Sequence, residues 1–151
     1  MFKSILIATD GSETSQKAAK MGVELAQMHG AKVTAVYVAD TSRLGYLSDY
    51  IQYSGIVREL MLKEGKDATN SVEELAKQAG VVCDKIILEG RPSDELLRMS
   101  KESGVDLLVL GSVGRGGLDR FLLGSVAEKV VQHSKVPIML VPGGKLGKLL
   151  T

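Results

Sequence analysis

The sequence predicts an α/β fold: an open five-stranded parallel sheet with helices on both faces, in a three-layer sandwich. Five short apolar runs, several rich in β-branched residues, are separated by longer segments in which apolar residues recur at helical spacing. Strands joined by helices pair in parallel through right-handed crossovers. With 151 residues, 44% of them hydrophobic, the chain can form one domain with a substantial core. We expect this domain to span residues 1–143 and the tail 144–151 to be loose.

Each element follows from a local pattern. Compact apolar runs indicate strands, and glycines at 30, 80 and 104 end the helical periodicities. The first helix is expected to bury Ala18, Met21, Gly22, Leu25 and Met28. Residues 40–54 break the rhythm and are predicted to form a loop, with or without a short helical turn. The predicted strands are 4–9, 32–39, 82–88, 105–110 and 137–141, and the predicted helices are 12–29, 55–79, 93–103 and 125–134.

Composition and missing motifs exclude several classes of function. The net charge of +1 gives no electrostatic reason to expect a nucleic-acid or membrane partner. The apolar run 5–8 is too short for a membrane span or a signal peptide, so we expect a cytoplasmic protein. Cys83, the one cysteine, opens a strand predicted to be buried, which favours a packing role over a redox role. The sequence has no P-loop lysine motif and no nucleophile elbow, and we assign no catalytic residue.

A glycine-rich motif carries most of the functional signal. Gly111-Ser112-Val113-Gly114 follows the fourth predicted strand, and nine residues later Gly124-Ser125 opens the last predicted helix. Glycines let backbone N–H groups approach phosphate oxygens, and a helix N-terminus favours negative charge. The motif therefore predicts an anion site. The alternative is that these glycines only shape the turn between strand and helix.

This motif resembles the nucleotide-binding signature of the universal stress protein family. The resemblance spans nearly the whole chain, from residues 5–10 through 37–40 to 136–141. It implies the strand order 3-2-1-4-5, which places the switch point between strands one and four and brings Asp10 and Gly111 to one crevice. It also implies a stress-response regulatory protein that binds ATP, ADP or AMP and acts through ligand-dependent conformation or partner choice.

The resemblance and the glycine motif together assign roles to several site residues. Backbone at Ala8 and Val38 would line the adenine pocket, with Val38 bonding the base through its main chain. Gly111 and Gly114 would pass close to the ribose and first phosphates. Amides at the start of the last helix would hold the outer phosphates. The full predicted site comprises Ala8, Thr9, Asp10, Val38, Leu110, Gly111, Ser112, Gly114, Arg115, Gly124, Ser125 and Val126.

Three of these side chains have alternative roles. Asp10 could hold a ribose hydroxyl or a Mg²⁺ or Mn²⁺ ion bridging phosphates, or it could cap the first helix. Ser125 could contact phosphate, or it could form a capping box with Glu128. Arg115 could pair with a phosphate or remain a solvated loop charge. The Ser112 hydroxyl could also reach the nucleotide.

The last strand predicts a homodimer. Residues 136–142 carry no charge, and in the implied strand order they lie at the sheet edge, where unpaired backbone groups invite a second strand. The alternative is that the tail from Gly143 covers this edge. Two other functions compete with the regulatory one: a weak ATPase or phosphotransfer enzyme, and a structural dimerisation module that binds no nucleotide.

Overall fold

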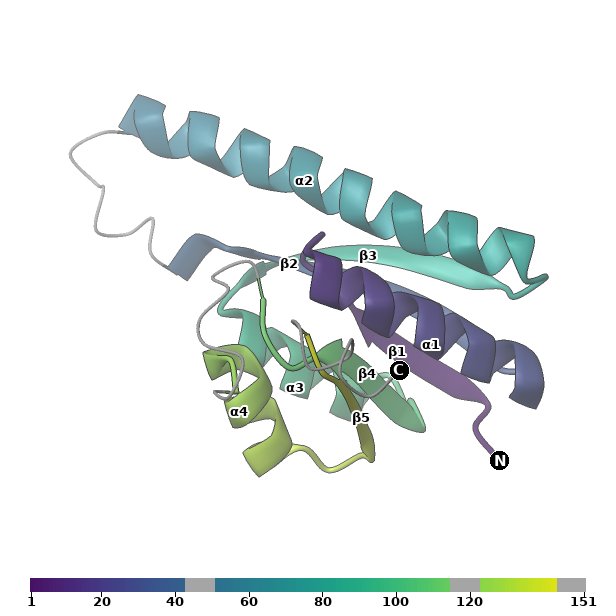
Figure 1. Ribbon diagram of the computed structural model, residues 1–151. Coiled ribbons are helices and arrows are strands. Elements are labelled where there is room, and N and C mark those ends of the chain that lie inside the picture. The colour runs from purple at the N-terminus through teal and green to yellow at the C-terminus, as the bar shows by residue number, and fades with distance from the viewer. Residues whose placement is uncertain (43–50, 115–122, 144–151) are drawn as a thin grey trace.

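The computed structural model describes residues 1–42, 51–114 and 123–143, with the backbone alone at 51–54. Strands and helices alternate along the described chain (Figure 1). The strands are β1 Ser4–Ala8, β2 Lys32–Asp40, β3 Cys83–Gly90, β4 Leu107–Gly111 and β5 Ile138–Val141, and the helices are α1 Glu13–His29, α2 Ile51–Gln78, α3 Pro92–Glu102 and α4 Ser125–His133.

The five strands form one parallel sheet in the order β3-β2-β1-β4-β5, which confirms the predicted topology. β1 is central, with β2 on one side and β4 on the other. The chain winds outward from β1 to β3 and then crosses back to β4 and β5. The connections that follow β1 and β4 therefore leave the sheet in opposite directions. In open α/β sheets, ligands bind at such a switch point, at the carboxyl ends of the strands.

Two apolar layers hold the helices on the sheet. Ile5 and Ile7 of β1 are fully buried in the layer that contains α1 and α2. Leu6, whose side chain points to the opposite face, is fully buried with residues of α3 and α4. Figure 1 shows α1 and α2 together on one side of the sheet. Burying each such side chain contributes about 1.5–3 kcal/mol, so the alternation along β1 fixes both helical layers.

The buried face of α1 differs from the predicted one. Met21 and Met28 are 47% and 80% exposed. A Cβ atom on Gly22 would lie 2.7 Å from Cδ1 of Ile7, which shows how closely the helix approaches the sheet. Close approach requires small side chains, so the buried face is built mainly from Ala18, Ala19, Gly22, Val23 and Ala26.

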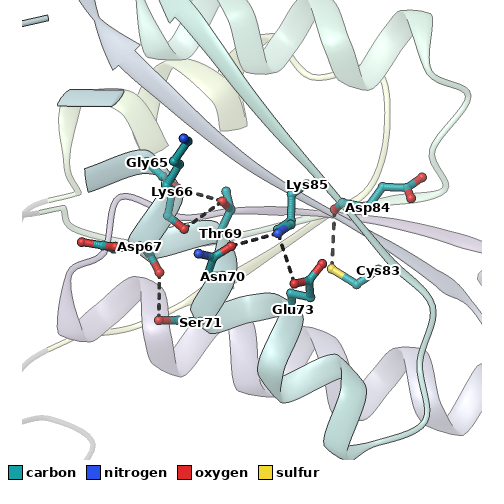
Figure 2. Close-up of polar contacts among 10 residues, drawn as sticks. All are labelled: Gly65, Lys66, Asp67, Thr69, Asn70, Ser71, Glu73, Cys83, Asp84 and Lys85. Carbon is teal, nitrogen blue, oxygen red and sulfur yellow. Dashed lines mark hydrogen bonds and ion pairs between the residues drawn. The ribbon is translucent and has the colours of Figure 1, made fainter. Parts of the chain in front are cut away.

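The third strand was expected to be buried, and this is wrong because β3 forms an edge of the sheet. Lys85 of β3 reaches α2, where its Nζ lies 2.9 Å from Oδ1 of Asn70 and 3.1 Å from Oε1 of Glu73 (Figure 2). Cys83 is half-buried against the α1–α2 layer. Burial raises the pKa of its thiol, which keeps the sulfur protonated and supports a packing role.

The second helix begins at Ile51, four residues before the predicted start at Gly55. Residues 51–54 therefore belong to the helix and not to the predicted loop 40–54. Gly55 then lies inside the helix, where its cost of about 1 kcal/mol is tolerated over 28 residues. Within the described ranges, no helix combines the length and hydropathy needed to span a bilayer.

Candidate functional site

The turn after β1 meets the loop after β4. β1 and β4 pair directly, with Ile7 opposite Val109, so both segments leave the sheet side by side. A Cβ atom on Gly114 would lie 2.7 Å from Oδ2 of Asp10. The structure therefore brings Asp10 and Gly114 together at the switch point of the sheet.

The β1–α1 turn assigns the capping role to Ser12. Ser12 is the N-cap of α1, where its Oγ accepts a hydrogen bond from the Ser15 amide. Asp10 does not cap the helix. Its Oδ1 accepts from the Ser12 amide at 2.9 Å, which shapes the turn and leaves Oδ2 directed toward Gly114.

Thr9 supports this turn from the α1 side. Its side chain is buried, and its Oγ1 accepts from the Gly11 amide and lies 3.2 Å from Oγ of Ser15. The Thr9 amide donates to the carbonyl oxygen of Val36 in β2. Carbonyl groups two residues apart on a strand point to the same side, so the Val38 carbonyl points past the end of β1 toward the crevice.

The glycines of the β4–α4 loop are closely packed. A Cβ atom on Gly111 would lie 2.7 Å from Cγ2 of Thr14, and one on Gly124 would lie 3.1 Å from the Ser112 carbonyl oxygen. Both glycines therefore serve the fold of the loop itself. Gly114 is exposed. The described atom that a Cβ on Gly114 would approach most closely belongs to the Asp10 carboxylate and not to the backbone.

The start of α4 differs from the expectation in two respects. The N-cap is Gly124, whose carbonyl accepts from the Glu128 amide, so the predicted capping box of Ser125 with Glu128 is wrong. The Gly124 amide donates to the Ser112 carbonyl at 2.7 Å, so it is engaged within the loop rather than offered to a ligand. Helical bonding begins at Glu128, so the amides of Ser125, Val126 and Ala127 lie at the positive end of the helix without helical acceptors.

Four predicted site residues share one apolar wall. Ala8, Val38, Leu110 and Val126 all belong to the apolar cluster between the sheet, α3 and α4. Leu110 is buried, whereas the other three are partly exposed near the carboxyl ends of their strands and the start of α4.

An ion pair joins the two helices on this side of the sheet. Nζ of Lys129 in α4 lies 2.8 Å from Oδ1 of Asp94 in α3, and this hydrogen bond lowers the pKa of Asp94.

Some expectations stay open. Arg115 lies outside the described residues. In the described part of the chain, no group of three His, Cys, Asp or Glu residues could hold a metal ion. The predicted Mg²⁺ or Mn²⁺ ion at Asp10 would therefore need phosphate oxygens among its ligands.

A second hollow, of about 140 Å³, lies between α1 and α2. Thr9 and Gly11 border it, and Glu64 and Asp67 of α2 contribute carboxylates. Glu64 accepts a hydrogen bond from the Tyr37 hydroxyl at 3.4 Å. The lining residues of this hollow come from the β1–α1 turn, α1 and α2, and the described residues of the β4–α4 loop are not among them.

Thr14 and Gly143 were missed by sequence reasoning. Both lie far from the glycine motif in sequence but pack against it: a Cβ atom on Gly143 would lie 2.2 Å from Oγ1 of Thr14 and 3.0 Å from Cγ2 of Val113. The Gly143 amide donates to Oγ of Ser112. A glycine directly after the last strand was the available signal, but its partner on α1 is set by the tertiary fold.

Comparison with known proteins agrees with this architecture. A profile of the Universal stress protein family matches residues 1–142. Universal stress protein MJ0531 of Methanocaldococcus jannaschii is 37% identical over 141 residues, which are 93% of this chain and 82% of the relative. An open parallel sheet with two loops that meet at its switch point is an α/β architecture that commonly binds ligands there. This chain belongs to the universal stress protein family.

Solved structures show the same fold. The structure of hypothetical protein MJ0577 from the same organism has a TM-score of 0.83 at 27% identity, and the match covers 95% of this chain and 98% of that one. A universal stress protein family member from Arabidopsis thaliana with AMP bound has a TM-score of 0.69 at 18% identity, with coverage of 96% and 94%. At that identity the likeness concerns the fold alone.

Proposed function

We propose that this protein binds an adenine nucleotide, ATP, ADP or AMP, in the crevice between the β1–α1 turn and the β4–α4 loop. The single observation that carries the proposal is the contact of Asp10 with Gly114 at the switch point, beside the N-terminus of α4. In this proposal the protein is a cytoplasmic stress-response regulator whose conformation or choice of partner depends on its ligand.

The crevice offers a different chemistry to each part of a nucleotide. Adenine would lie against the apolar wall of Ala8, Val38, Leu110 and Val126, and the Val38 carbonyl would accept from the base. The Asp10 carboxylate would accept from a ribose hydroxyl or share a Mg²⁺ or Mn²⁺ ion with the phosphates.

Phosphates would occupy the positive end of α4. The amides of Ser125 and Val126 and the exposed Ser125 hydroxyl would donate to them. Arg115 would add a charged pair, and Gly111, Ser112 and Gly114 would bring the loop close to the ligand. Related proteins support an adenine nucleotide as the ligand, since structures with this fold hold cAMP, dAMP or AMP.

We also propose a homodimer formed through β5. Ile138 to Val141 form the edge of the sheet, and only β4 pairs with them among the described strands. Ile138, Met139 and Leu140 are partly exposed. Antiparallel pairing with a second copy would satisfy the outer backbone groups and cover these side chains.

Thermal unfolding with nucleotides tests the binding proposal. A ligand at about a hundred times its dissociation constant adds about 2.7 kcal/mol of stability, which corresponds to roughly 5–10 °C in melting temperature for a domain of this size. We expect ATP with magnesium to give such a shift, and GTP at the same concentration to give a smaller one. Mass spectrometry of nucleotide that co-purifies with the protein would identify the natural ligand. A melting curve unmoved by millimolar ATP, ADP and AMP would overturn the proposal.

A further inference from the structure

Ser112 joins three segments through its own polar groups. Its amide donates to the Val141 carbonyl at 2.8 Å, and its carbonyl accepts from the Gly124 amide at 2.7 Å. Its Oγ accepts from the Gly143 amide at 3.2 Å. We call Ser112, Gly124, Val141 and Gly143 the Ser112 junction. One residue of the glycine motif thus holds both the start of α4 and the end of β5.

Close packing gives the junction little freedom. Gly143 is buried, and any side chain there would collide with Thr14 Oγ1, 2.2 Å from the Cβ position. Gly111 is packed against the same threonine, 2.7 Å from its Cγ2 atom. The end of β5 and the glycine loop therefore share one neighbour on α1. A displacement of the loop must move the end of β5 or break its bond to Ser112.

The Ser112 hydroxyl has a proton that its bond to Gly143 does not use. A serine hydroxyl donates one hydrogen and accepts two, and Gly143 occupies one acceptor position. A phosphate or ribose oxygen in the crevice is an acceptor. If the Ser112 hydroxyl accepts from the Gly143 amide and donates to such an oxygen, the two hydrogen bonds form a chain. Each bond then strengthens the other.

We propose that Ser112 relays nucleotide occupancy to the end of β5 through this chain. The inference rests on the proposed nucleotide site and adds its regulation: the Gly143 amide is held more tightly when nucleotide is bound. Coupling between two sites is reciprocal, so contacts that fix the end of β5 would raise nucleotide affinity by the same factor. Since β5 is the sheet edge, the relay connects the ligand to the surface where a partner strand would pair.

The exchange rate of the Gly143 amide hydrogen, followed by NMR with and without nucleotide, tests this coupling directly. In the wild-type protein we expect saturating ATP with magnesium to slow this exchange by roughly 2- to 10-fold, because the existing bond from Gly143 to Ser112 Oγ opens less often when the hydroxyl also donates to the ligand. In Ser112→Ala we expect faster exchange without nucleotide, no slowing by ATP, and a dissociation constant for ATP raised by a similar factor. Ser112→Thr keeps the hydroxyl and should restore both properties.

Ser71→Ala is the matched control. The Ser71 hydroxyl also makes one hydrogen bond to the backbone, but there it donates to the Asp67 carbonyl within α2 (Figure 2). Ser71 has no bond to any residue of the junction. This variant should leave Gly143 exchange and ATP affinity unchanged. If the wild-type protein binds ATP but Gly143 exchange does not respond, or if Ser112→Ala binds ATP as tightly as the wild type, the relay is overturned and the nucleotide site stands. If the wild type binds no adenine nucleotide, both proposals fall.

Discussion

Single residues of the glycine motif differ in what they do for the fold. Gly111 and Gly124 are held by close packing against Thr14 and the Ser112 carbonyl, so replacing either would disturb the loop with or without a ligand. Gly114 is exposed, and among the described residues a Cβ atom there would approach only the carboxylate end of the Asp10 side chain. Gly114 is therefore the position where loss of binding can be separated from loss of structure.

Replacing Gly114 by valine should abolish the melting-temperature shift with ATP and leave the ligand-free melting curve almost unchanged. The new side chain displaces the Asp10 carboxylate and fills the path of the phosphates. Gly55→Val on α2 is the control, since a Cβ atom there has no described atom within 4 Å. Thermal unfolding with and without ATP measures both variants. A full ATP shift in Gly114→Val would remove this loop from the site.

Ser125 and Ser12 should respond in opposite ways to alanine. Ser125 is exposed and is not the N-cap, so Ser125→Ala should change stability by less than about 0.5 kcal/mol. Its loss of a hydrogen bond to charged phosphate should weaken ATP binding about 10- to 100-fold. Ser12→Ala removes the cap of α1 and should cost about 1 kcal/mol. Denaturant titration measures the stability of the two variants, and calorimetry measures their ATP affinity. Equal losses of stability in Ser125→Ala and Ser12→Ala would favour a cap at Ser125.

At the scale of elements, the start of β1 is anchored to the turn before β4. Oδ2 of Asp106 accepts from the amides of Lys3 and Ser4 at 2.6 and 2.9 Å. These hydrogen bonds, that to Lys3 foremost, lower the pKa of Asp106. A lowered pKa means that the carboxylate stabilises the fold above the ordinary aspartate pKa of about 3.9 and loses this effect as pH falls through the lowered value.

Asp106→Ala should therefore be less stable than the wild type at pH 7, and the difference should shrink below about pH 3.9. Urea unfolding at pH 7, 5 and 3 measures the difference in the free energy of unfolding. Asp84→Ala, which removes an exposed ion pair with Lys32, is the control and should have a small effect at every pH. A difference for Asp106→Ala that stays constant from pH 7 to pH 3 would contradict this role of the carboxylate.

At the scale of the whole molecule, the two sheet edges differ. β3 carries charged residues and is tied to α2 by Lys85, whereas β5 is uncharged. Met139→Lys or Leu140→Lys should give a soluble monomer, because each places a charge at the proposed pairing edge. Val82→Lys is the control beside β3, where the native side chain is already 67% exposed. Light scattering at tens of micromolar protein measures the oligomeric state of the wild type and of each variant. A monomeric wild type or a dimeric Met139→Lys would exclude β5 as the interface.

Hydrolysis of ATP should be slow. The chain lacks the lysine-containing P-loop that positions phosphates for transfer, and phosphoryl transfer depends on such positioning. We expect turnover well below about 1 per second, the low end of ordinary enzymes. Phosphate release from purified protein measures it. A faster rate that Asp10→Ala or Ser125→Ala removes would favour the enzymatic alternative.

The order of the strands and helices could be predicted from the chain alone. Apolar runs and helical periodicity depend on neighbours along the chain, so the strands and helices were placed within a few residues. The resemblance supplied the strand order that the sheet adopts. That order brought Asp10 and Gly111 to one edge of the sheet in advance, because each follows a strand that ends there, whereas the approach of Gly114 to Asp10 came from the structure.

How closely the helices, strands and loops approach one another could not be predicted, because it depends on packing between distant segments. The small residues on the buried face of α1, the edge position of β3 and the shift of the α4 cap from Ser125 to Gly124 all follow from packing across the sheet. The Ser112 junction joins residues 31 positions apart and is completed by a threonine at position 14. Such contacts have no local signature, because they depend on which surfaces the fold presses together.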